Sequence, residues 1–119
     1  MNQSDSATEE GAVFDLAAAD SELRKAAAYL QEGHTARTLV HQPDLRVVLV
    51  VMKAGTRIPE HGADGTATVH ALSGQLRLGT SEQTADLGVG SLFVLERGVR
   101  HDVEAVTDSA FLLTLGWRG

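Results

Sequence analysis

The chain has 119 residues, the length of a single domain, and carries a formal net charge of −6 with only ten Lys and Arg residues. These basic residues are scattered, whereas phosphate binding needs a basic patch, so we expect no nucleic-acid partner and no membrane surface as a partner. The absence of cysteine excludes disulfides, thiolate metal sites and a cysteine nucleophile, and it favours the cytoplasm.

The first 34 residues precede any expected strand and divide into two parts. Residues 1–11 are polar and acidic and predict a disordered tail, because they have no apolar surface to bury. Residues 12–34 are Ala-rich, and we expect one helix there, from about Asp15 to Glu32, with Gly33 as its left-handed C-cap. Apolar residues at helical spacing predict its buried face: Leu23, Ala26, Ala27 and Leu30.

From residue 35 to residue 119 the sequence predicts only β structure, in seven or eight short strands typical of a sandwich or barrel. Leu45–Met52 has six consecutive apolar residues, so we expect this strand to be buried on both faces. Residues 68–78 predict a hairpin that turns at Ser73-Gly74, with a positive φ at Gly74. Residues 81–85 are polar and predict a connection. Three more strands are expected, at Ser91–Leu95, His101–Ala105 and Ala110–Trp117.

Glycine and histidine recur at fixed spacings in this region. Gly55 is followed, after five residues, by His61, and Gly74 closes the stretch. This arrangement resembles the first motif of the cupins, which reads Gly, five residues, His-x-His, three or four residues, Glu, six residues, Gly. The second cupin motif reads Gly, five residues, Pro-x-Gly, two residues, His, three residues, Asn. Its matching residues are Gly90, Gly98 and His101.

The resemblance implies an all-β fold, a small jelly-roll (cupin) β-barrel over residues 35–119 with one N-terminal α-helix. It also implies that His61 and His101 lie on strands across the barrel from each other, with both side chains pointing inward. Cupin metal sites resemble a cage of three histidines and one glutamate. Here Ala63 replaces the second histidine and Ala67 the glutamate, so two cage positions are lost. Two imidazoles can bind Zn, Ni, Fe, Mn or Cu, although divalent sites usually take a third protein ligand.

His70 is the first candidate for that third ligand. It follows the glutamate position by three residues, so a regular strand would point it to the opposite face and only a bulge would turn it inward. Asp64 could supply an oxygen from the loop, whereas Glu60 should point away from His61. The predicted metal ligands are therefore His61 and His101, with His70 as a weaker candidate.

Three functions follow as hypotheses. The first is a protein of unassigned reaction that binds a divalent metal or a small molecule in the barrel through His61 and His101. The second is a metal-dependent enzyme of dioxygenase, isomerase or decarboxylase type, and the third a ligand-binding module without metal or turnover. We expect apolar pocket walls from Val69, Phe93 and Val103. The apolar outer face of Leu45–Met52 further predicts a homodimer packed through sheet surface.

Overall fold

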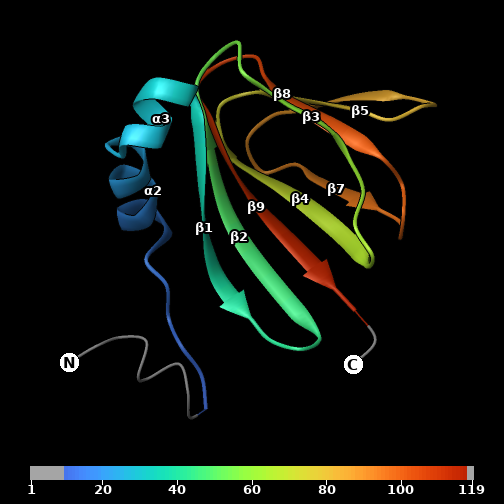
Figure 1. Ribbon diagram of the computed structural model, residues 1–119, viewed down its shortest axis with the longest axis horizontal. Helices are drawn as coiled ribbons and strands as arrows, with labels where there is room; N and C mark the ends of the chain where they lie inside the picture. Colours follow the sequence, from blue (N-terminus) through green and yellow to red (C-terminus); the bar gives the residue numbers. More distant parts are fainter. Residues whose placement is uncertain (1–9, 118–119) are drawn as a thin grey trace.

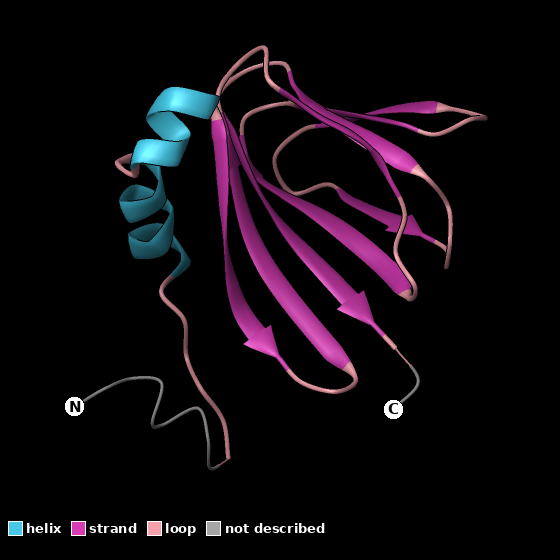
Figure 2. Ribbon diagram, in the orientation of Figure 1, coloured by secondary structure: helices cyan, strands magenta, loops and turns pink. Residues whose placement is uncertain are grey.

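Two antiparallel sheets account for the chain after residue 33 in the computed structural model, which describes residues 10–117 (Figures 1 and 2). The larger sheet has the strand order β1-β2-β9-β4-β7 and the smaller one β3-β8-β5-β6. The larger sheet consists of β1 (His34–His41), β2 (Leu45–Met52), β9 (Ser109–Gly116), β4 (Thr66–Ser73) and β7 (Leu92–Leu95). The smaller sheet consists of β3 (Arg57–His61), β8 (His101–Ala105), β5 (Leu76–Gly79) and β6 (Thr84–Leu87). The all-β jelly-roll prediction is confirmed.

The apolar run in β2 is buried on both faces, as its sequence predicts. Val50 and Met52 point between the two sheets and join the main core, whereas Leu49 and Val51 point outward to a second cluster under the helices. Alternation along a strand sends successive side chains to opposite faces, so only a strand covered on both sides can be apolar throughout. The outer face of β2 is thus covered within this chain.

The N-terminal segment forms two short helices rather than the single helix expected. α2 (Leu16–Arg24) and α3 (Ala27–Glu32) are separated because Ala26 adopts an extended backbone conformation. The break lets Leu23 and Tyr29 both pack against the larger sheet, while Leu30 is left 58% exposed. Helices this short depend on tertiary packing, so the sheet surface overrides the helical spacing. Gly33 does end α3 in the left-handed conformation.

The turn at Ser73-Gly74 is a corner between the sheets and does not close a hairpin. β4 pairs with β7 and β9, whereas β5 pairs with β6 and β8. Gly74 nevertheless has the predicted positive φ, +78°, because a chain that leaves one sheet for another needs the same sharp reversal. The polar stretch at residues 81–85 also overlaps β6, which begins at Thr84.

The predicted tail, residues 1–11, lies largely outside the described residues, and so do residues 118–119. The boundaries proposed for the tail, the helical segment and the barrel therefore stay predictions. Among residues 10–117, no helix has both the length and the apolar character needed to cross a membrane.

Candidate functional site

His61 and His101 come together at one end of the barrel. They lie opposite each other in the β3–β8 pairing, so their strands are neighbours and not across the barrel as expected. The ring centroids are 4.3 Å apart and the ring planes are inclined by 55°. An irregularity in the pairing between Ile58 and His61 places the two histidines in register. The structure therefore brings the two predicted residues into contact.

Backbone carbonyls define which nitrogen of each ring carries the proton. His61 Nδ1 lies 3.0 Å from the carbonyl oxygen of Pro59, and His101 Nδ1 lies 3.2 Å from that of Val99. A carbonyl oxygen can only accept, so each Nδ1 must donate, and in a neutral ring Nε2 keeps its lone pair. Histidine ligands of metals usually show this pattern of one anchored and one free nitrogen.

His101 is the more enclosed member of the pair, with 3% of its surface exposed. Burial lowers the pKa of His101 below its usual value, since the charged imidazolium would lose hydration. Proximity to His61 lowers this pKa further, while the hydrogen bond to Val99 opposes the shift. The environment thus favours the neutral ring, which is the form that can bind a metal or accept a hydrogen bond.

A cavity of about 290 Å³ opens beside the two rings. Ala63 and Ala67, at the two lost ligand positions, are part of its wall, and their short side chains leave room next to the imidazoles. Among the described residues, the lining consists of Arg46, His61, Gly62, Ala63, Asp64, Ala67, His101, Leu113, Leu115 and Trp117.

The apolar wall differs from the one predicted. Val69 and Val103 are buried in the main core, with 0% and 2% exposure, and they do not line this cavity. Phe93 borders a different surface hollow. The apolar walls come instead from Leu113 and Leu115, which lie nearer the open end of the barrel.

The structure does not bring His70 to the histidine pair. β4 alternates regularly through this position, with Ala67, Val69 and Ala71 buried on the inner side, so His70 faces outward beside Leu112. Among residues 10–117, no group of three His, Cys, Asp or Glu side chains is arranged to hold a metal.

The two carboxylates considered from the loop behave differently from each other. Glu60 forms an ion pair with Arg100 at 3.2 Å and does not line the cavity, which agrees with its predicted orientation. Asp64 lies in the cavity wall and is exposed to solvent.

Arg46 and Trp117 line the site, and neither residue was predicted from the sequence. Arg46 is the one charged residue in β2, and at a spacing of two it shares a face with Val48 and Val50. Trp117 continues the inward-facing series of Leu113 and Leu115. A count by twos along each strand would have found both residues, because that spacing defines a face.

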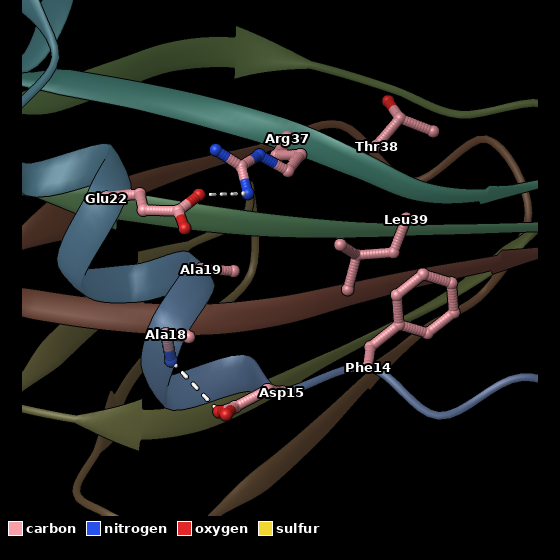
Figure 3. Close-up of a pocket in the computed structure, with 8 residues that line it drawn as sticks. All are labelled: Phe14, Asp15, Ala18, Ala19, Glu22, Arg37, Thr38 and Leu39. Atoms are coloured by element: carbon pink, nitrogen blue, oxygen red, sulfur yellow. Dashed lines mark hydrogen bonds and ion pairs between the residues drawn. The ribbon is translucent and has the colours of Figure 1, made fainter. Parts of the chain in front are cut away.

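A second hollow, of about 330 Å³, lies between α2 and β1 on the outer side of the larger sheet (Figure 3). Its polar groups bind each other: Glu22 pairs with Arg37 at 2.9 Å, and the Asp15 carboxylate accepts from the Ala18 N–H at 3.0 Å. Because those groups are already satisfied, the histidine cavity is the better candidate site.

Comparison with known protein families identifies the family to which the chain belongs. The family model described as "Cupin domain" matches residues 48–115, which include both histidines and more than half of the chain. The protein belongs to the cupin family. The comparison with curated proteins found no match.

Solved structures share the fold at low sequence identity. A conserved protein of unknown function from Streptococcus pyogenes has a TM-score of 0.72 at 24% identity, covering 100% of this chain and 95% of that one. A cupin-2 domain protein from Shewanella frigidimarina has a TM-score of 0.70 at 17% identity, covering 88% and 95%. Salicylate 1,2-dioxygenase from Pseudoaminobacter salicylatoxidans, in adducts with gentisate, has a TM-score of 0.77 at 19% identity, covering 87% of this chain but 32% of the dioxygenase.

Proposed function

We propose that this protein binds a divalent metal ion through Nε2 of His61 and His101, together with a small molecule in the adjoining cavity. The observation that carries the proposal is the contact between the two rings, each with Nδ1 anchored on a carbonyl. Two free Nε2 lone pairs suit Zn, Ni, Cu, Fe or Mn, whereas Mg and Ca prefer oxygen ligands. Members of the cupin family commonly bind metals and small molecules in the barrel.

The donor set fits such an ion only in part. Two protein nitrogens leave the remaining coordination positions to water or to the bound molecule, so we expect weaker binding than at a four-ligand site. When bound, the metal would act as a Lewis acid on an oxygen of the small molecule. Dioxygenase, isomerase and decarboxylase chemistry are all compatible with that role, and the reaction is left unassigned.

The second candidate is a small-molecule-binding module without metal. It is favoured by Ala63 and Ala67, which remove two donors, and by the absence within residues 10–117 of any three donors arranged to hold a metal. In that case the free Nε2 atoms would accept hydrogen bonds from the ligand.

Zinc titration by calorimetry separates the two candidates. Protein prepared without an affinity tag and treated with chelator should bind one Zn²⁺ per chain, and His61→Ala or His101→Ala should abolish the binding. His70→Ala is the matched control and should bind as the parent does, because His70 faces outward. Affinity should fall as pH drops through about 6.5, since a protonated ring cannot coordinate. If the parent protein does not bind zinc, the metal-binding proposal is rejected and the metal-free binding module remains.

We also propose a homodimer, through a different surface from the one the sequence indicated. Leu92 and Val94 lie on the outer side of β7, an edge strand, and are 59% and 57% exposed. In the pairing with β4, Leu92 lies opposite His70 and Val94 opposite Thr68. These four residues form one patch on the outer face of the sheet. Light scattering at micromolar concentration should show a dimer, and Leu92→Glu should shift it to the monomer. A monomeric parent protein would contradict this proposal.

The expected cytoplasmic location, and the expected lack of nucleic-acid and membrane partners, stay predictions. They rest on the cysteine-free composition and the scattered basic residues alone.

A further inference from the structure

Arg46 brings a cationic group into the cavity from the strand opposite the histidines. It lies in β2 next to Leu115 of β9, and both side chains line the cavity wall. The three inner-face residues that follow it along β2 are apolar, so Arg46 marks the point where the core gives way to the cavity. A charge at such a boundary costs hydration, and that cost is usually offset by a partner.

No carboxylate in the described residues pairs with this guanidinium. Five other arginines each form an ion pair with an Asp or Glu: Arg24, Arg37, Arg57, Arg77 and Arg100. Arg46 instead contacts His41 Nε2 through Nη2, at 3.0 Å, and lies over the Trp117 ring at 5.6 Å. Its Nε is buried and has no hydrogen-bond partner among residues 10–117.

A buried donor without an acceptor needs a ligand or water to satisfy it. The guanidinium is a planar fork of donors that matches the two oxygens of a carboxylate. The cavity beside it has apolar walls, Leu113 and Leu115, and Asp64 also belongs to its lining, where a negative charge would repel a highly charged anion. These features favour a ligand with one negative charge and an apolar body.

We propose that Arg46 is the anion-binding residue of this cavity, and that the ligand is a small monocarboxylate whose carboxylate binds the guanidinium while its apolar body contacts Leu113 and Leu115. The inference deepens the proposed function by naming a ligand class for the same cavity. The carboxylate site itself needs no metal, because Arg46 supplies the charge.

Trp117 provides a local signal for the test, since it is the only tryptophan in the chain and contacts Arg46. Chelator-treated protein is titrated with benzoate and, separately, with benzamide, its uncharged analogue of the same shape. We expect a saturable change in Trp117 fluorescence with benzoate, and binding at least about tenfold weaker with benzamide, because a charge-assisted hydrogen bond is lost.

Four variants localise the effect. Arg46→Gln should weaken benzoate binding about tenfold or more, to the level of benzamide, whereas Arg46→Lys should retain part of the preference for the anion. Arg77→Gln is the control, because it removes an exposed arginine on the smaller sheet, paired with Asp86. Asp64→Asn should tighten benzoate binding by removing a like charge. Thermal melting of each variant establishes whether it is folded. If Arg46→Gln does not fold, the comparison of Arg46→Lys with the parent protein tests the proposal instead.

Equal binding of benzoate and benzamide, or unchanged benzoate binding in Arg46→Gln, would overturn the proposal. Inorganic phosphate is the competitor, and displacement of the signal by phosphate in preference to benzoate would also overturn the assignment to carboxylates. The outcome is independent of the metal. Zinc binding without benzoate binding would reject the carboxylate site alone, and benzoate binding without zinc binding would reject the metal alone.

Discussion

The two ends of the barrel interior are built on the same strands but differ in chemistry. At the closed end, near the Ser73-Gly74 corner, the inward-facing side chains are apolar and buried; at the open end, the same strands present the groups that line the cavity. The same contrast occurs along three strands. β2 has Met52 at its closed end and Arg46 at its open end, and β8 has Ala105 and His101 in the same places. β9 has Phe111 toward the closed end, and Trp117 follows it at the open end.

This difference separates the residues that stabilise the fold from the residues that can bind a ligand. The closed end removes apolar area from water and stabilises the barrel. The open end holds a buried donor that has no partner among residues 10–117, Arg46 Nε, which lowers the stability of the fold until a ligand or water bonds to it. Mutations at the two ends should therefore affect different measurements.

The largest expected effect on stability is at the closed end. Leu76 is fully buried, with 0% exposure, so Leu76→Ala leaves a cavity in the core and should lower the free energy of unfolding by about 3 kcal/mol. Leu115→Ala is the matched change at the open end and should cost about 1 kcal/mol or less, because the lost methyl groups border an existing hollow. Denaturant titration measures both, and equal losses would contradict the division of the barrel.

The next effect is at the corner between the sheets. Gly74→Val should lower the free energy of unfolding by about 2 kcal/mol or more, because valine resists a positive φ and a Cβ there would collide with Asp108 and Ser109. Gly90→Val is the control: Gly90 also has a positive φ, +88°, but a Cβ there meets nothing within 4 Å. Chemical denaturation of both variants should show the smaller loss for Gly90→Val. The opposite order would mean that the corner tolerates a side chain.

The spacings of glycine and histidine predicted the fold and the approach of His61 to His101 through their resemblance to the cupin motifs. They could not predict which strands pair, because a glycine with positive φ serves equally well in a hairpin and in a corner between sheets, as Gly74 shows. The prediction of a single helix was wrong because packing against the sheet, through Leu23 and Tyr29, decides where the segment divides into two helices. Arg46 was not predicted as a site residue because its strand is otherwise apolar. Only its position on the inner face of β2 places it in the cavity lining.

The smallest effect concerns pH. Burial lowers the pKa of His101, so below about 6.5 the unfolded chain binds more protons than the folded protein. The free energy of unfolding of the metal-free protein should therefore fall as pH drops through and below that value, and it should be unaffected by His101 above it. His101→Gln should flatten this dependence in urea titrations across the range. A variant whose curve runs parallel to that of the parent would show that His101 is not responsible.

The most direct test of the open end as a binding site is nitrogen NMR of the two imidazoles during zinc titration. Spectra of the metal-free protein at neutral pH should show His61 and His101 both protonated on Nδ1, as their carbonyl contacts require. Added Zn²⁺ should then shift the Nε2 resonances of these two residues and leave those of His70 in place. Protonation on Nε2 in either ring, or Nε2 resonances that do not respond to zinc, would contradict the account.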